Sequence, residues 1–234
     1  KKFRFDSEGK IRYIKVSDYN TTGMEYKENC DQSPFLAFVQ AVGLDVKNNE
    51  GAGGSFGFGK AAYFYMSPFR TLLVSTKTKD GEYFFEGVSS LCTHTMSEYG
   101  RDVKKVSVGF YDDNKGKPVS VYENIPVRFR RNSDNGSGTD IFIMGMTATL
   151  SDFVEVIQKA VLRNFWMAMC DRKLIVKVGT ITIDADTIGK IIDRIFTDEE
   201  DTHNLSNYNP KPYYKLYKEF CGGASGVACY EQKD

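Results

Sequence analysis

The sequence predicts an α+β fold, in which short antiparallel strands come first and helices become more frequent toward the C-terminus. In the first 150 residues, apolar side chains alternate with polar ones in short runs, separated by turn sequences such as TKDGE and DDNKG. Alternation around a Gly-containing turn is typical of β-hairpins. After residue 150, the apolar spacing becomes that of amphipathic helices. We therefore expect a domain at residues 1–150 and a smaller helical or α+β segment at 151–234, which would act as a transducer or linker.

The N-terminal part predicts a hairpin and two helices. Alternating residues at 3–5 and 11–16 flank the turn sequence DSEG, so a hairpin is expected. Residues 33–42 begin with Ser-Pro and have helical apolar spacing, which indicates a short helix. The stretch at 61–66 follows a glycine-rich loop and is compact and apolar, so we expect a buried helix there.

The middle of the chain predicts a sheet built from hairpins. Residues 71–76 and 83–88 flank TKDGE, whose Asp-Gly pair is a turn signal. Residues 106–111 and 118–121 flank DDNKG in the same way. Two hairpins are therefore expected in this region.

Two further strands are expected before residue 150. Residues 127–131 alternate, and Arg128, Arg130 and Arg131 are expected to form a solvated face of that strand. Residues 139–144, TDIFIM, are mostly apolar, as in a strand that is buried on both faces. This last strand should be central in the sheet.

A change of pattern marks the C-terminal segment. Ser151 and Asp152 are expected to cap a long amphipathic helix at 152–169, with Trp166 packed inside the core. Three further elements are expected in chain order: a hairpin at 173–184, a helix at 188–196 and a polar surface loop or linker at 197–212.

Charge and cysteine content exclude several classes of function. The 31 basic and 31 acidic residues cancel, which argues against a strong sequence-independent grip on nucleic acid or on an anionic membrane. The five cysteines form no C-x-x-C pair, so neither a disulfide framework nor a zinc site is indicated. His94 and His203 lie in no metal or triad motif and are expected at the surface. No apolar run approaches the roughly 20 residues that span a bilayer, and a cytoplasmic location without a membrane partner is expected.

Three segments carry residues suited to nucleotide binding: VSDYNTTGM at 16–24, GGSFGFGKA at 53–61 and GSGTDIFI at 136–143. Asp18 stands where a strand opens into a loop, and a carboxylate there can accept a hydrogen bond from the exocyclic amine of adenine. Gly23 would let the backbone approach the flat base. Each segment alone has an ordinary explanation, because an isolated Asp before polar residues is usually a turn and a glycine-rich loop is usually a connector.

The second segment offers a cradle for phosphates. Gly54, Gly57 and Gly59 stand just before or at a predicted helix, whose first N–H groups are unpaired, and Lys60 adds a positive charge. The spacing also nearly matches the P-loop pattern G-x-x-x-x-G-K. The P-loop motif needs a Ser or Thr hydroxyl for Mg²⁺ where this chain has Ala61. It also follows an apolar strand, whereas the polar loop KNNEGAG precedes the segment here, so the P-loop interpretation is disfavoured.

In this order and spacing, the three segments resemble the motifs of the gyrase, heat-shock chaperone, histidine kinase and MutL (GHKL, or Bergerat-fold) ATPases. VSDYNTTGM resembles their D-x-G-x-G-M box, GGSFGFGKA the G-x-F-G-x-G lid segment of the chaperone-like branch, and GTDIFI their late G-T strand. The resemblance covers residues 11–145 and extends to bacterial chaperone-like ATP-binding proteins, some of them associated with defence or restriction systems. It implies a two-layer α/β sandwich with a mixed, mostly antiparallel sheet, in which the nucleotide lies between sheet and lid.

The resemblance also implies a role for individual residues. Asp18 would recognise adenine, Asn20, Gly23 and Met24 would lie at the base pocket, and Thr139 would support the adenine end through Asp18 or a bound water molecule. The lid over the phosphates would consist of Gly54, Ser55, Phe56, Gly57, Phe58, Gly59 and Lys60. The implied cofactors are ATP and Mg²⁺, the implied ligand is an adenine nucleotide, and the family also suggests a homodimer of the full-length protein.

Two departures from the family pattern affect these expectations. Asn20 stands where the family usually has Gly, in a box that is one residue longer, although Asn tolerates the left-handed conformation. The family's E-x-x-x-N helix, whose Glu activates water and whose Asn binds Mg²⁺, does not precede Asp18. The expectation is therefore a fragment of a longer protein, inactive alone, with the catalytic Glu and the Mg²⁺ ligand in the missing helix.

Two functions remain open at the level of sequence. The first is an ATPase that couples nucleotide binding and slow hydrolysis to the closure of a lid or dimer. The second is a nucleotide-binding or degenerate regulatory module that acts by conformation and interaction, without turnover. The sequence indicates no client or nucleic-acid partner for either.

Overall fold

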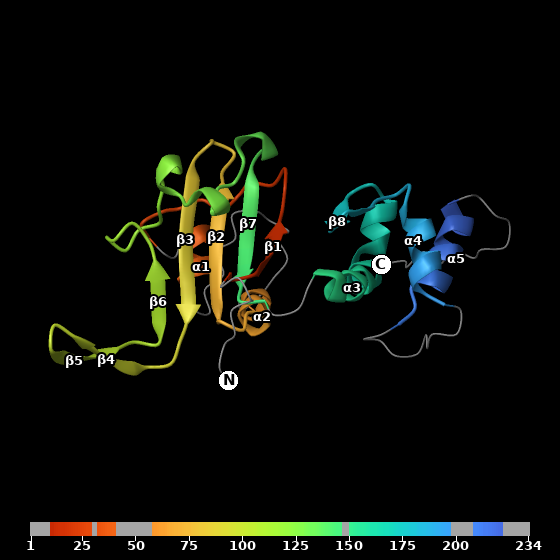
Figure 1. Cartoon of the computed structure of the whole chain (residues 1–234). Coiled ribbons are helices and arrows are strands. Elements are labelled where there is room, and N and C mark those ends of the chain that lie inside the picture. The colour runs from red at the N-terminus through yellow and green to blue at the C-terminus, as the bar shows by residue number, and fades with distance from the viewer. Residues whose placement is uncertain (1–9, 30–31, 41–57, 147–149, 198–207, 222–234) are drawn as a thin grey trace, which may run out of the picture. The chain divides into compact units, whose positions relative to one another are not determined.

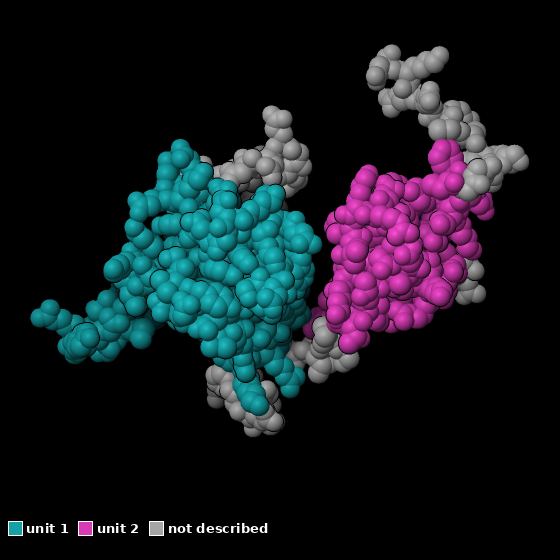
Figure 2. Space-filling model, turned by 90° about the horizontal axis from the view of Figure 1, so that it is seen from above, with its two compact units in different colours: residues 1–147 teal, residues 148–234 magenta. Residues whose placement is uncertain are grey.

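The computed structural model describes residues 10–29, 32–40, 58–146, 150–197 and 208–221. The chain divides into two compact units, Lys1–Thr147 and Ala148–Asp234 (Figure 2). The expected boundary lay at residue 150. The expected strand at 3–5 and most of the glycine-rich loop lie outside the described residues.

A five-stranded sheet forms the centre of the first unit (Figure 1). Its strand order is β1-β7-β2-β3-β6, and each neighbouring pair is antiparallel. The strands are β1 (Tyr13–Ser17), β2 (Thr71–Lys77), β3 (Tyr83–Ser90), β6 (Val108–Tyr111) and β7 (Gly138–Met144). The predicted α+β class with a mostly antiparallel sheet is confirmed. The predicted central strand is also confirmed, because β7 lies between β1 and β2 and is buried except at its last residue.

Two helices pack against one face of this sheet. Phe35 of α1 (Pro34–Val39) and Phe64 of α2 (Phe58–Met66) belong to one apolar cluster with Leu72, Val74 and Ile141. Full burial of a side chain of this kind contributes about 1.5–3 kcal/mol, so the helix layer is held mainly by these contacts. The opposite face carries a smaller cluster of Phe85, Val119 and Ile125. Three short 3₁₀ turns follow Val119 along the chain: η2 (Tyr122–Asn124), η3 (Val127–Phe129) and η4 (Ser133–Asn135).

Both predicted helices of the first unit are present, and they differ in burial. Ser33 caps α1 as expected, since its hydroxyl accepts a hydrogen bond from the N–H of Leu36 and Pro34 takes the first helical position. The helix expected at 61–66 begins earlier, at Phe58. The prediction that it is buried is wrong, because only one side meets the sheet and Tyr65 and Met66 are exposed.

Of the two hairpins predicted for the middle of the chain, one is correct. β2 and β3 pair around a turn in which Gly81 has a φ of +87°. The hairpin predicted around DDNKG is wrong, because β6 pairs with β3 and the segment after the turn contributes only a single bridge, Val119 to Phe85.

Another hairpin, formed by β4 (His94–Glu98) and β5 (Arg101–Lys105), was not predicted from the sequence. Its two-residue turn, Tyr99 and Gly100, has φ values of +51° and +74°. Positive φ at both central residues is the geometry of the type I′ turn that matches the twist of paired strands. The signal was weak because Tyr at the first of these positions is unusual.

The strand predicted at residues 127–131 is also wrong. Val127–Phe129 forms the 3₁₀ turn η3, and Arg131 is fully buried instead of lying on a solvated face. The expectation of a solvated face failed because Arg131 has a buried carboxylate partner, Asp140, on a strand nine residues later.

The second unit packs three helices with a small hairpin. Its elements are α3 (Leu150–Cys170), β8 (Val176–Val178), β9 (Ile181–Ile183), α4 (Ile188–Ile195) and α5 (Lys211–Cys221). Trp166 lies in the core as expected, with Leu162, Ile188 and Phe196. Since α3 begins at Leu150, Ser151 and Asp152 lie inside its first turn, and the predicted cap is wrong.

Helix α5 was not predicted, although Tyr214 and Tyr217 set their rings edge-on to Trp166. Helical propensity alone does not reveal a helix that is held by such contacts at the end of a polar segment. In the described part of the chain, no helix is both long and apolar enough to cross a bilayer.

Candidate functional site

The end of β1 presents a carboxylate that is fixed from the neighbouring strand. Asp18 follows β1, its N–H donates to the carbonyl of Thr139 on β7 (2.9 Å), and the N–H of Thr139 donates to Asp18 Oδ1 (2.7 Å). The hydroxyl of Thr21 donates to the same oxygen at 2.9 Å. Asp18 is exposed, and no donor among the described residues reaches its Oδ2. The side chain is therefore held in place while one acceptor oxygen faces solvent.

A buried arginine supports this strand end from the other face of the sheet. The Arg131 guanidinium donates to Asp140 Oδ1 (2.8 Å) and to the carbonyl of Asp18 (2.6 Å), and it lies 5.0 Å from the Tyr19 ring centroid. Lys15 Nζ approaches Asp140 Oδ2 to 2.8 Å, although this contact lacks hydrogen-bond geometry. Buried charges of this kind are tolerated only when they are paired, so Arg131 and Asp140 depend on each other.

The rest of the Asp18 loop is tied to β2. The N–H of Met24 donates to the hydroxyl of Thr76 (2.9 Å), which in turn donates to the carbonyl of Gly138 and lies 3.1 Å from the hydroxyl of Thr139. Asn20 has a φ of +60°, the left-handed conformation that the sequence predicted it would tolerate. The loop, β2 and β7 thus form one hydrogen-bonded assembly beneath Asp18.

Two glycines of this assembly are required by close packing of the protein itself. Gly23 has a φ of +69°, and a Cβ there would lie 2.3 Å from the carbonyl oxygen of Lys77. Gly138 has a φ of +141°, and a Cβ there would lie 2.4 Å from Asp18 Oδ1 and 2.6 Å from Arg131 Nη2. The structure therefore gives Gly23 a packing role against β2, and any contact with a base would come in addition.

Only the end of the glycine-rich segment belongs to the described residues. Gly54, Ser55, Phe56 and Gly57 lie outside them, whereas Phe58, Gly59 and Lys60 form the first turn of α2. Lys60 Nζ donates to the carbonyl of Val39 at the end of α1 (3.3 Å).

Tyr63, also on α2, is close enough to Asp18 to be affected by its charge. Burial, together with the nearby Asp18 carboxylate, raises the pKa of Tyr63 above its ordinary value. The Tyr63 ring also contacts Phe38 of α1 edge-on, at a centroid distance of 6.3 Å. α2 therefore places an aromatic residue within electrostatic reach of Asp18, and no motif in the sequence marks Tyr63.

A second buried carboxyl, Glu86 on β3, lies under the helix layer and was also missed. Its Oε1 accepts a hydrogen bond from Gln40 Nε2 at 2.7 Å, and Oε2 has no partner among the described residues. Burial raises the pKa of Glu86 to about 7, while the Gln40 hydrogen bond lowers it and the charges of Asp112 and Asp113 raise it further. A single Glu in a sequence of alternating apolar residues gives no signal of such an environment.

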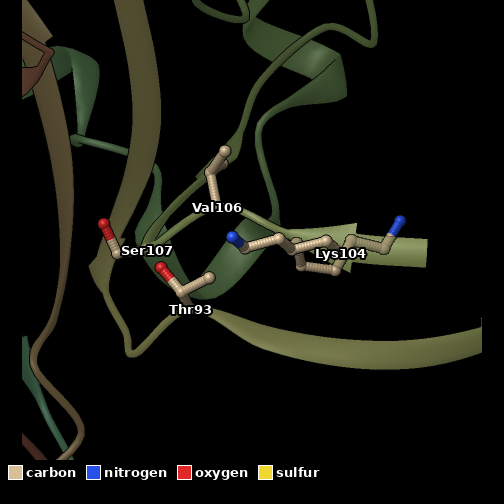
Figure 3. Close-up of a pocket in the computed structure, with 5 residues that line it drawn as sticks. Thr93, Lys104, Val106 and Ser107 are labelled. Atoms are coloured by element: carbon tan, nitrogen blue, oxygen red, sulfur yellow. The ribbon is translucent and has the colours of Figure 1, made fainter. Parts of the chain in front are cut away.

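Neither of two open depressions in the first unit lies at Asp18. The larger, 420 Å³, is lined by Thr93, Lys104, Lys105, Val106 and Ser107, at the base of the β4–β5 hairpin (Figure 3). A smaller one of 200 Å³ lies beside β6 and includes Leu91 and Phe110. Across the described residues, no group of three or more His, Cys, Asp or Glu side chains gathers as a metal site would require.

Comparison of the chain with protein-family models, with curated proteins and with solved structures found no match.

Proposed function

We propose that the first unit binds an adenine nucleotide and is the ATP-binding domain of a GHKL-type ATPase. The observation that carries this proposal is the Asp18 carboxylate, which is exposed and held at the end of the sheet by the N–H of Thr139. An acceptor that is fixed before binding loses little side-chain entropy when it meets the exocyclic amine of adenine. Guanine carries a carbonyl oxygen at the corresponding position, which an ionised carboxylate repels.

The surroundings of Asp18 suit a flat base. Tyr63 offers an aromatic side chain from the helix layer, and Met24 is a half-buried apolar residue on the same loop. Small-molecule sites commonly combine apolar and aromatic walls with a few polar groups that set orientation. In this proposal the base lies between the Asp18 loop and α2.

The phosphates would be bound by the glycine-rich segment, from Gly54 to Lys60. The N–H groups of the first helical turn, which includes Gly59 and Lys60, have no partner within the helix and favour an anion. Mg²⁺ would accompany the phosphates. Closure of this segment over ATP would be the event that the ATPase couples to a lid or dimer.

The alternative function is a nucleotide-binding regulatory or interaction module without turnover. The observation that favours it is the first box itself, which is one residue longer than in the family and has Asn20 where the family usually has Gly. Phosphate release by the full-length protein at saturating ATP and Mg²⁺ separates the two functions. Release above the uncatalysed background supports the ATPase, whereas tight binding of ATP without release supports the module.

Calorimetric titration of the chain with ATP, ADP and GTP tests the common premise. We expect ATP and ADP to bind more tightly than GTP, and Asp18→Asn to weaken ATP binding by roughly 10- to 150-fold, the value of a hydrogen bond to a charged group. The Asn carbonyl can still accept from Thr139, so the loop should stay folded. Asp102→Asn, on exposed strand β5, is the matched control. Equal affinity of the native and Asp18→Asn proteins for ATP would disprove the role of Asp18.

A further inference from the structure

The sheet of the first unit has an edge that is suited to pairing with another strand. β6 pairs with β3 on one side, and within the described residues no strand pairs with its other side. The N–H of Leu91 donates to the carbonyl of Ser107, in register with the β3–β6 ladder. Because backbone groups alternate in direction along an antiparallel strand, Ser107 and Gly109 turn theirs toward β3. Val108 and Phe110 therefore turn their N–H and C=O groups outward.

The side chains along this edge are apolar and exposed. Val106 is 76% exposed, Val108 39% and Phe110 43%, and Leu91 is exposed beside them. Edge strands usually carry charged side chains, Pro or a bulge within the strand, which prevent pairing with another chain. β6, with the sequence VGFY, carries no charge and no Pro.

Opposite charges flank the strand at its two ends. Lys104 and Lys105 precede β6 and are separated from it by two residues, and Asp112 and Asp113 follow it directly. Hydrogen bonds from the backbone N–H groups of Lys115 and Lys117, together with the charges of those two lysines, lower the pKa of Asp113, so its carboxylate is ionised at neutral pH. The segment KKVSVGFYDD is thus basic at its start and acidic at its end.

The basic end coincides with the larger of the two depressions. Thr93, Ser107, Lys104 and Lys105 all line this depression, and Figure 3 shows one lysine ammonium group pointing toward the two hydroxyl groups and the other pointing away. Lys105 also forms an ion pair with Glu98 at 2.7 Å. The volume of the depression, 420 Å³, is ample for one or two carboxylate side chains. The depression therefore matches the chemistry of the Asp112–Asp113 turn, which lies at the other end of β6.

We propose that this edge binds a second copy of the same chain, through antiparallel pairing of β6 with β6 about a two-fold axis at Gly109. In this register, Val108 of each copy pairs with Phe110 of the other, because these are the two residues of β6 whose backbone groups face outward. Antiparallel pairing reverses the direction of the strand. It therefore brings the lysines of each copy to the acidic turn of the other, at the depression that Lys104 and Lys105 line.

Two contributions hold this interface together. Pairing satisfies the outward backbone groups of Val108 and Phe110 in both copies and covers their side chains. The complementary charges fix the register, since a parallel arrangement would set lysine against lysine. The inference does not depend on nucleotide binding, and its test contains no nucleotide, so either can fail without the other.

Sedimentation equilibrium of the whole chain is the first test. We expect a reversible monomer–dimer equilibrium that weakens as salt is added, because the flanking charges are exposed. If the charges serve only to keep the edge from pairing, the chain will remain monomeric from micromolar to millimolar concentration at low salt, and the proposal fails.

Charge reversal tests the register. Lys104→Glu/Lys105→Glu makes both ends of the segment acidic, and Asp112→Lys/Asp113→Lys makes both ends basic. Each variant alone is expected to dimerise at least about tenfold more weakly than the native chain. An equimolar mixture of the two is expected to form a heterodimer, because every contact is again between opposite charges. Unchanged self-association of each variant, or a mixture that does not associate, overturns the proposal.

Amide hydrogen exchange gives a readout at the backbone that does not depend on the variants. Exchange at Val108 and Phe110 is expected to slow as the native protein concentration rises, while exchange at Thr95 on the exposed β4–β5 hairpin stays constant. Circular dichroism confirms that the variants are folded, which matters because Asp113 also accepts turn hydrogen bonds from Lys115 and Lys117. Concentration-independent exchange at Val108 and Phe110 would contradict strand pairing even if the chain dimerised by another surface.

Discussion

The sheet of the first unit buries two carboxyl groups, one on each face, and their surroundings are opposite in kind. Asp140 lies on the face away from the helices, where Arg131 and Lys15 place two cations at 2.8 Å from its oxygens. Glu86 lies beneath the helices, where its nearest polar partner is the neutral amide of Gln40. Both side chains are fully buried. The difference shows that burial alone does not determine what a carboxyl does, because the partner decides which protonation state is stable.

This difference also separates two functions within one sheet. The Arg131–Asp140 pair reaches the backbone of Asp18 and therefore holds the proposed adenine contact. Glu86 lies next to Gln40 and is also influenced by Lys60, the last residue of the proposed lid segment. Asp140 thus supports the Asp18 loop through Arg131, whereas Glu86 changes its protonation near neutral pH.

Arg131→Met should have the largest effect on stability. It leaves the Asp140 carboxylate buried with only Lys15 nearby, and breaking a buried pair typically costs about 3–5 kcal/mol. Denaturant unfolding measures this loss, and Arg128→Met, at an exposed arginine three residues away, is the control. The double variant Arg131→Met/Asp140→Asn should recover part of the loss. If Arg131→Met unfolds at the same denaturant concentration as the native protein, the pair is not a support for the loop.

Glu86→Gln should remove a pH dependence of stability. The folded-state pKa of Glu86 is raised from 4.5 to about 7, so its contribution is fully present below pH 4.5 and is lost as the pH rises through 7. The linked change in the free energy of unfolding is at most about 3 kcal/mol. The difference between native and Glu86→Gln proteins, measured by denaturant unfolding from pH 4 to 8, should therefore follow that curve. Glu82→Gln, at an exposed turn, should track the native protein.

Much of this sheet was predictable because its signals are local. Asp-Gly marked the β2–β3 turn, the apolar run TDIFIM marked the central strand, and Ser-Pro marked the start of α1. In the same way, the sequence marks the strand end at Asp18 and the late Gly-Thr pair. In the structure, the N–H of Thr139 donates to Asp18 Oδ1 at 2.7 Å.

The partners of these residues were not predictable, because each comes from a distant segment. Arg131 looked like a surface residue until Asp140 and the carbonyl of Asp18 were found around it. No motif in the sequence marks Glu86, whose partner Gln40 comes from the end of α1, 46 residues earlier in the chain. Periodicity shows which residues share a face, but it does not show what packs on that face.

Thr76→Val tests the Asp18 loop with a smaller change. Valine has nearly the same shape as threonine but no hydroxyl, so the N–H of Met24 loses its acceptor and the hydroxyl of Thr139 loses a neighbour. A buried group left without a partner costs about 1–3 kcal/mol. We expect lower stability and also weaker ATP binding, because the loop that carries Asp18 is no longer tied to β2. Thr95→Val on exposed strand β4 is the control. Loss of stability with unchanged ATP affinity would show that the tie between the loop and β2 does not contribute to ATP binding.

The smallest expected effect comes from an ion pair that differs from Arg131–Asp140 mainly in exposure. Arg172 and Asp186 in the second unit lie 2.8 Å apart, the same distance as the buried pair, yet both side chains are more than 70% exposed. Solvent and salt screen such a pair, so Asp186→Asn should change the free energy of unfolding by less than about 1 kcal/mol. Because the two pairs share their length and chemistry, the ratio of the two effects measures what burial adds. If Asp186→Asn destabilised the protein as much as Arg131→Met, geometry and not burial would set the strength of these pairs.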